Sequence, residues 1–451
     1  MKIDFEHLGG IEKGSIELND FTLFCGKNNS GKTYVMYALY GLLDKQFNCC
    51  FDFVEPIVDT LKQKGRYSLD VLDLITAYQE EIIVDVEKQF KRNLPNLFGV
   101  TDSDFLNSKI KLHLFYKKIE KNIENSKYSI YSANNLSWKV TLNADKEAIE
   151  LILDTSEVGD DDVLQAFISN ILVDILFFNC DEYHQRHNFL LPAERAGMNL
   201  FFKELFSIRN LLLQQAQNDS VNPMRLLKDV LKSRYAEPVK DYMQFLNRIG
   251  SDRIETSVYS EYAQSIEKNV LGGKYEVDEF GNVFFLPSDS QNKLPLHFSS
   301  STVKTLFGLV FYLEHIAKSG DYLMIDEPEL NLHPDNQREV ARILAQLVNA
   351  GIKVVVSTHS NYFMREINNL IMLKNEFAGV EELRQKYQYH ENELLDKYRV
   401  SAYLFDKKTI FPMPIDEEGI IVETFDTVTD ALNQSSDDIY FTMQDAKDAD
   451  N

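Results

Sequence analysis

The chain of 451 residues has few cysteines. There are four, unevenly spaced at Cys25, Cys49, Cys50 and Cys180. This pattern does not predict a disulfide framework and suits a reducing compartment. An export signal is not expected either, because acids occur within the first six residues, where such a signal needs basic residues and then a long apolar core. We therefore expect a cytosolic protein.

Long apolar runs are also missing. The most apolar long stretch, Val163–Phe178, is interrupted by polar residues at Gln165, Ser169, Asn170 and Asp174. It is too short to span a bilayer, so we expect no membrane segment and no membrane partner. The sequence contains no internal repeat and no low-complexity block.

Positive charge is in deficit, with 47 Lys and Arg residues against 70 Asp and Glu residues and a net charge of -23. This balance argues against a protein that coats nucleic acid through its overall field, although a local basic groove is compatible with it. Hydrophobic residues make up 44% and charged residues 26%, which is ordinary for a globular protein. The length predicts roughly two to four domain-sized units.

A complete phosphate-binding pattern lies near the N-terminus. Residues Gly26-Lys27-Asn28-Asn29-Ser30-Gly31-Lys32-Thr33 fit G-x-x-x-x-G-K-[ST], between a β-prone run and a helical run. The backbone N–H groups of this loop, with the helix N-terminus, would cradle phosphates, Lys32 would reach the β- and γ-phosphates, and Thr33 would bind Mg²⁺. A plain glycine turn would not explain the adjoining Lys-Thr. The pattern predicts a nucleotide site.

Two acids, Asp326 and Glu327, directly follow the apolar run Tyr322–Ile325. At the end of a buried parallel strand, Asp326 would lie at the ligand edge of the sheet and hold Mg²⁺. Glu327 would orient and deprotonate the attacking water. The alternative is a strand that ends in solvated acids. Together with the phosphate loop, the acids favour Mg²⁺-dependent hydrolysis of ATP.

A family resemblance rests on two further stretches. Asp326–Pro334 and Val354–Ser360 resemble the Walker B, D-loop and switch-histidine region of ABC-type ATPases of the Rad50, SMC, RecF and OLD group. The resemblance covers residues 1–43 and 294–373. It implies that His359 contacts the γ-phosphate and that Asn331–Pro334, as the D-loop, meets a second subunit.

The same family has a glycine-containing signature loop that opens a helix. In this chain its place is taken by Ser299, Ser300 and Ser301, without the glycines. Serine hydroxyls, free N–H groups and a helix N-terminus would still bind an anion, here the γ-phosphate held by another subunit. This predicts a head-to-tail pair with two ATP molecules at the interface. The alternative is ordinary N-capping by serine.

The predicted fold class is α/β, an ABC-type P-loop ATPase head with a mixed and parallel sheet plus a helical insertion. Alternating strands and helices after residue 301 predict the parallel part. The predicted units are an N-terminal ATPase lobe with Walker A and an added helix and strand region (1–197), a helical insertion (198–273), a C-terminal ATPase lobe with the signature loop, Walker B and switch histidine (274–373), and a C-terminal helix and hairpin region with an acidic tail (374–451).

Several local elements are predicted from periodicity. Residues 48–89 read as amphipathic helices, and residues 111–153 as a small antiparallel sheet. In the C-terminal region we expect a charged helix over 381–398 and a hairpin of 401–405 with 409–413.

Two features remain open. No Q-loop glutamine is identifiable, but Phe189–Gly197 resembles the Pro-Ser/Ala-Glu-Arg stretch of the same ATPases, so Glu194 or Arg195 could substitute for it. Cys180, His184 and His187 match no standard zinc spacing and are interpreted as surface polar residues.

The resemblance extends to function. The size and the short helical insertion are similar to the sensor ATPases of bacterial anti-phage systems such as Septu (PtuA) and PARIS (AriA). OLD nucleases carry a Toprim domain after the ATPase, whereas Asp416–Gly419 is interpreted here as a solvated turn. We therefore expect a cytosolic ATPase whose ATP-bound dimer or higher assembly controls a separate effector protein, for example a nuclease.

There are two alternatives to this function. The first is a DNA-repair or DNA-end-binding ATPase of the RecF or Rad50 kind. It would need a basic face in the helical insertion, which could be formed by Lys203, Arg209, Arg225, Lys228, Lys232, Arg234 and Lys240. The second, the ATP-binding half of a transporter, is disfavoured because the serine loop and Thr358-His359-Ser360 look like the soluble branch.

Overall fold

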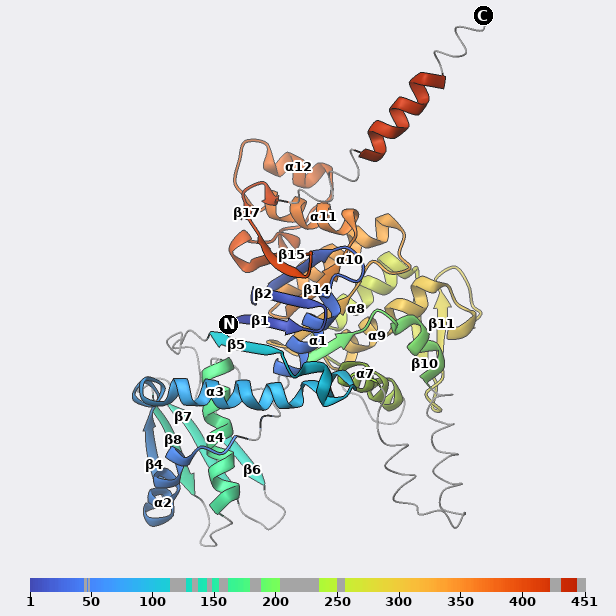
Figure 1. Cartoon of the computed structure of the whole chain (residues 1–451). Coiled ribbons are helices and arrows are strands. Elements are labelled where there is room, and N and C mark those ends of the chain that lie inside the picture. Colours follow the sequence, from blue (N-terminus) through green and yellow to red (C-terminus); the bar gives the residue numbers. More distant parts are fainter. Residues whose placement is uncertain are drawn as a thin grey trace, which may run out of the picture.

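The computed structural model describes residues 1–43, 47, 49–113, 127–131, 137–143, 148–153, 161–178, 188–202, 235–249, 256–421 and 431–443. Its central feature is a nine-stranded mixed sheet with the strand order β5-β1-β2-β16-β15-β3-β14-β13-β9 (Figure 1). The strands are β1 (Lys2–Leu8), β2 (Ile11–Glu17), β3 (Phe21–Gly26), β5 (Lys109–His113), β9 (Asn188–Leu191), β13 (Tyr322–Asp326), β14 (Lys353–Thr358), β15 (Val400–Asp406) and β16 (Thr409–Met413).

Helices cover both faces of this sheet. The α-helices include α1 (Lys32–Leu43), α2 (Glu55–Lys64), α3 (Val71–Phe98), α4 (Asp161–Phe178), α7 (Glu237–Arg248), α8 (Ser260–Ser265), α9 (Ser301–His315), α10 (Pro334–Asn349), α11 (Asn361–Met372) and α12 (Val380–Lys386). Of these, α2 and α4 pack against each other beside a second, smaller sheet (Figure 1). None of the helices described is long and apolar enough to cross a membrane.

Strands β15, β3, β14, β13 and β9 run parallel to one another. Alternate residues of these strands face opposite cores: Met324 and Val355 pack with α1 and α3, whereas Leu323 and Val354 pack with α9, α10 and α11. Burial on both faces explains why β13 and β14 read as continuous apolar runs in the sequence. The α/β fold class with a mixed and parallel sheet is confirmed.

The predicted C-terminal hairpin forms as β15 and β16 and is part of the central sheet. β15 pairs in parallel with β3, from Val400 opposite Phe21 to Phe405 opposite Gly26. β16 continues the sheet to β2 through Thr409 and Lys13. The chain after residue 373 therefore supports the strand that carries the phosphate loop.

A second sheet, of four antiparallel strands in the order β4-β8-β7-β6, lies beside the central one (Figure 1). Its strands are β4 (Arg66–Asp70), β6 (Lys127–Tyr131), β7 (Ser137–Asn143) and β8 (Ala148–Leu153). The small antiparallel sheet is thus confirmed. The all-helical interpretation of 48–89 is wrong at β4, because Gly65 adopts a left-handed conformation (φ 70°) that ends α2 and lets the chain pair with β8.

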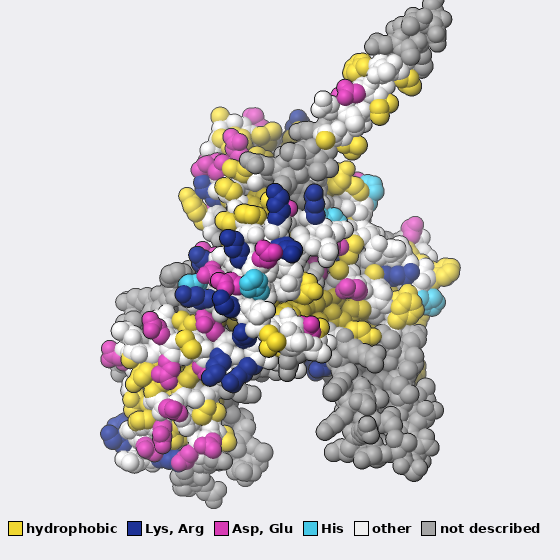
Figure 2. Space-filling model, viewed as in Figure 1, with side chains coloured by type: hydrophobic (Ala, Val, Ile, Leu, Met, Phe, Trp, Pro, Cys, Tyr) yellow, Lys and Arg dark blue, Asp and Glu magenta, His cyan; other side chains and the backbone are white. Residues whose placement is uncertain are grey.

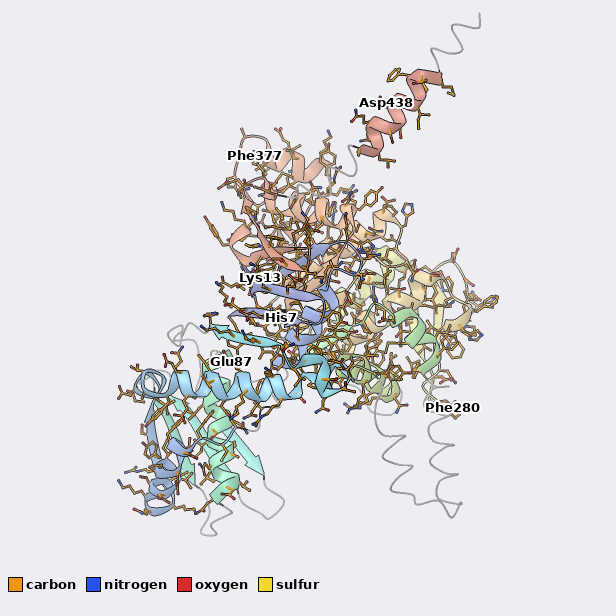
Figure 3. All side chains as sticks on the ribbon, viewed as in Figure 1. His7, Lys13, Glu87, Phe280, Phe377 and Asp438 are labelled. Atoms are coloured by element: carbon orange, nitrogen blue, oxygen red, sulfur yellow. The ribbon has the colours of Figure 1, made fainter. Side chains whose placement is uncertain are left out.

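The charged helix predicted over 381–398 is also wrong. α12 ends at Lys386, and Gln388 has a φ of 57°, which a continuing helix cannot accommodate. The chain turns there and buries Leu394 and Leu395 in the core. A helix at 431–443, which the sequence analysis did not predict, extends away from the rest (Figure 1). Figure 3 labels Asp438 on it and Phe280 on the hairpin of β10 (Gly273–Val277) and β11 (Val283–Pro287).

Helix α7 packs against α9 and is linked to it through Asn199. The fully buried Tyr242 of α7 donates a hydrogen bond to Asn199 Oδ1 (2.7 Å), and Asn199 Nδ2 donates to the Lys304 carbonyl of α9 (2.7 Å). A Cβ atom added to Gly308 would lie 2.0 Å from the Tyr242 hydroxyl. Close packing of α7 on α9 therefore requires glycine at 308.

We expect Gly308→Ala to lower the free energy of unfolding by about 1–3 kcal/mol through overpacking. Urea denaturation measures this change. The matched control is Gly197→Ala, at an exposed helical position where a Cβ meets nothing within 4 Å. It should be neutral or slightly stabilising. Equal stability of Gly308→Ala and the wild type would contradict the packing argument.

Candidate active site

The phosphate loop has the conformation that a phosphate cradle needs. Gly26 (φ 145°) and Gly31 (φ 100°) adopt left-handed conformations that favour glycine. A Cβ at Gly26 would lie 2.4 Å from the Phe405 carbonyl oxygen, and one at Gly31 would lie 2.5 Å from Ile11 Cδ1. Larger residues would disturb the loop, so both glycines are required for its shape.

Lys32 starts α1 and lies inside the loop. Its Nζ donates to the carbonyls of Gly26 (2.9 Å) and Lys27 (2.9 Å). Burial lowers the pKa of Lys32, and the carboxylate of Asp326 acts in the opposite direction. The buried hydroxyl of Ser30 has no hydrogen-bond partner. An unsatisfied hydroxyl and a lysine bound only to loop carbonyls fit a site built for triphosphate oxygens.

Thr33 and Asp326 meet across the sheet edge. The Thr33 hydroxyl donates to Asp326 Oδ2 (2.9 Å), and Ser357 donates to Asp326 Oδ1. Hydroxyl and carboxylate oxygens are the donors that Mg²⁺ prefers, and Mg²⁺ usually completes its shell with phosphate oxygens and water. In the described ranges no group of three or more His, Cys, Asp or Glu residues could hold a metal by itself. The oxygens of Thr33 and Asp326 are of the kind that holds Mg²⁺ together with a bound nucleotide.

Strand β14 lies between β3 and β13 and places His359 beside Glu327. His359 Nδ1 is 3.5 Å from Glu327 Oε1. Glu327 itself has a φ of 52°, and its N–H donates to the Ser357 carbonyl (3.0 Å). Burial raises the pKa of Glu327, the positive charge of His359 lowers it, and Asp326 raises it further. A carboxyl with a raised pKa at this edge suits a general base.

Glu329 was not singled out by the sequence analysis. It is 7% exposed, and its Oε1 accepts hydrogen bonds from the Thr358 hydroxyl (2.9 Å) and the His359 N–H (2.9 Å). Its other oxygen is buried without a hydrogen-bond partner. The only signal in the sequence is the second acid of Asp-Glu-Pro-Glu. This side chain fixes the backbone at the switch histidine.

Arg195, but not the exposed Glu194, contacts the acidic strand end. Its guanidinium donates to the carbonyls of Asp326 (2.7 Å), Glu327 (2.7 Å) and Pro192 (3.1 Å). The side chain is bound to the backbone of the two acids rather than aimed at a ligand. This geometry does not support Arg195 or Glu194 as a direct substitute for a Q-loop glutamine.

The serine loop opens α9 and lies next to the predicted D-loop. Ser300 caps the helix by accepting from the Val303 N–H (3.3 Å), as in the capping alternative. Ser299 is buried and donates to the Pro295 carbonyl (3.2 Å), whereas Ser300 and Ser301 are exposed. Thr302 donates to the Asn331 carbonyl (2.9 Å). Among the described residues, no hydrogen bond or ion pair joins this loop to the phosphate loop.

A hollow of about 910 Å³ lies beside the phosphate loop. Its walls come from the phosphate loop, the start of α11 and the end of β15, and they include Gly26, Lys27, Asn28, Glu329, His359 and Phe405. The phosphate loop and the switch histidine, His359, therefore line the same hollow.

Other predicted residues lie outside the described ranges. These are Cys180, His184 and His187, and all of the proposed basic face except Lys240, which is exposed on α7. On the face shown in Figure 2, a band of Lys and Arg side chains is interrupted by acids. Among the described lysines, Lys109 forms an ion pair with Glu6 and Lys408 forms one with Glu12.

The fold and the site together define a P-loop ATPase of the α/β class. A family model described as "AAA ATPase domain" matches residues 1–364, and the chain belongs to this family. Comparison with curated proteins finds no match.

Solved structures with distant similarity include SMC head domains. One is an SmcHead bound to the C-winged helix domain of ScpA, with 13% identity, a TM-score of 0.37, and coverage of 92% of this chain and 98% of that chain. The SMC head domain from Thermotoga maritima has 10% identity, a TM-score of 0.30, and coverage of 92% and 98%. An Smc head from Pyrococcus furiosus, bound to the C-terminal domain of ScpA, has 10% identity, a TM-score of 0.30, and coverage of 96% and 98%.

The raised pKa of Glu327 predicts the pH dependence of hydrolysis. A base must be deprotonated, so kcat should fall as the pH is lowered through this pKa. The fall should begin at a higher pH than for an ordinary glutamate, whose pKa is about 4.3. His359→Ala removes a charge that lowers this pKa, so the acid limb should move to higher pH. A limb that stays in place or moves to lower pH would contradict this assignment.

Proposed function

We propose that the chain hydrolyses ATP with Mg²⁺ at composite sites formed by two subunits arranged head to tail. One observation carries the proposal. Thr302, next to the exposed Ser300 and Ser301, is bound to Asn331, and among the described residues no hydrogen bond joins either segment to the phosphate loop. A γ-phosphate held by Lys32 would therefore meet the α9 N-terminus only when a second subunit supplies it.

Each part of the site then has a role in phosphoryl transfer. The loop N–H groups and Lys32 bind the phosphates, and Mg²⁺ held by Thr33 and Asp326 would neutralise charge on them. Glu327 orients the attacking water and accepts its proton, while His359 binds the γ-phosphate. The exposed N–H groups at Ser301 of the partner's α9 stabilise the charge that builds up on the transferred group.

Hydrolysis coupled to pairing provides a switch. ATP binding would join two subunits and hydrolysis would separate them, so a protein that recognises the pair is held only in the ATP state. We infer that the chain controls a separate effector of this kind, a nuclease in bacterial anti-phage defence. The size of the chain and its predicted short helical insertion, which are similar to those of sensor ATPases of such systems, support this function.

Mixing two inactive variants tests the composite site. Lys32→Ala removes the phosphate contact, and Ser301→Glu places a negative charge where the partner's γ-phosphate would bind. A mixed pair contains one site with neither change, so an equal mixture should recover about one quarter of wild-type activity. The matched control is Ser301→Gln, which is neutral and should stay active. No recovery, when tagged subunits demonstrably pair, would contradict the arrangement.

The effector hypothesis is tested by co-expression with the protein encoded next to this chain in its genome. Glu327→Gln should bind ATP but hydrolyse it only very slowly, and should therefore retain the effector in the presence of ATP and lose it with ADP. Co-purification followed by nuclease assay measures both association and activity. Association that is unaffected by nucleotide would contradict the switch.

A further inference from the structure

Glu327 has a strained backbone that other residues must hold in place. A non-glycine residue at a φ of 52° costs free energy and persists where its surroundings fix it. On one side the Glu327 N–H is bound to the Ser357 carbonyl. On the other side the carbonyls of Asp326 and Glu327 both accept hydrogen bonds from Arg195. The strained residue is therefore clamped between β14 and the chain that follows β9.

Arg195 is placed to make this clamp rigid. β9 pairs in parallel with β13, so the chain leaves β9 beside the two acids. Arg195 is 2% exposed and begins a helix at 195–202. One turn later Asn199, 1% exposed, is bound to Lys304 of α9 and to Tyr242 of α7. The first turn of this helix is therefore fixed at both Arg195 and Asn199.

The chemistry of the side chain suits the task. A planar guanidinium donates to two neighbouring carbonyls from nitrogens held in a fixed fork, whereas an ammonium group donates from one nitrogen on a flexible stem. No carboxylate forms an ion pair with Arg195 among the described residues, so its charge is felt by the nearby carboxylates of Asp326, Glu327 and Glu329. The charge of Arg195 and its hydrogen bonds therefore both act on Asp326 and Glu327.

We propose that Arg195 is a positioning residue for ATP hydrolysis, which fixes the backbone of Asp326 and Glu327 and thereby directs the Glu327 carboxylate toward the attacking water. This inference rests on the proposed role of Glu327 as general base. Arg195 need not touch the nucleotide. It should therefore influence the hydrolytic step more than nucleotide binding.

Steady-state hydrolysis and ATP binding of Arg195→Met and Arg195→Lys test the proposal. In Arg195→Met we expect kcat to fall at least about tenfold while the Kd for ATP changes less than about threefold. Arg195→Lys keeps the positive charge but loses the planar guanidinium, so its kcat should lie between those of Arg195→Met and the wild type.

A double variant separates positioning from general support of the fold. If Arg195 acts through Glu327, adding Arg195→Met to Glu327→Gln should not lower single-turnover hydrolysis further. A further tenfold loss in the double variant, or ATP binding that weakens in step with kcat, would overturn the proposal. If Arg195→Met does not fold, the same double-variant test is made with Arg195→Lys. Unchanged hydrolysis in Glu327→Gln alone would instead overturn the proposed function.

Discussion

The hydrogen bond between Thr33 and Asp326 joins two residues 293 positions apart, and the rest of the site depends on the strand order that makes it. β14 separates the strand of the phosphate loop from the strand of the acids. Because parallel strands end at the same edge, this order places Lys32, His359 and Glu327 in one row. The sheet converts two distant stretches of sequence into one site.

Acidic and basic side chains lie close together at this edge of the sheet. Asp326, Glu327 and Glu329 bring three carboxyl groups together in a chain that is already strongly acidic. Two buried cations lie near them: Lys32, which is bound to the carbonyls of the phosphate loop, and Arg195, which is bound to the carbonyls of Asp326 and Glu327. The cations limit the repulsion between the acids, and burial keeps the pKa of Glu327 above its usual range. An acidic edge can thus bind a triphosphate and still hold a base.

Much of this could be predicted from the sequence, because the signals were local. The phosphate loop follows a spacing, and the strands before Gly26 and Glu327 are short apolar runs between recognisable turns. The roles of Arg195 and Glu329 could not be predicted, because they depend on burial and on bonds to backbone atoms that no spacing reveals. β4 and the early end of α12 were missed where left-handed residues, Gly65 and Gln388, override helical periodicity.

Among the described residues, the serine loop is not bound to the phosphate loop of its own chain. The exposed Ser301 starts α9, and the next residue, Thr302, is bound to Asn331. In the proposed head-to-tail pair, this surface receives the nucleotide of the second copy. Light scattering of Glu327→Gln with and without ATP tests this claim most directly. The account predicts that ATP with Mg²⁺ doubles the mass of the species and that ADP does not. A mass that stays constant while ATP is bound would contradict it.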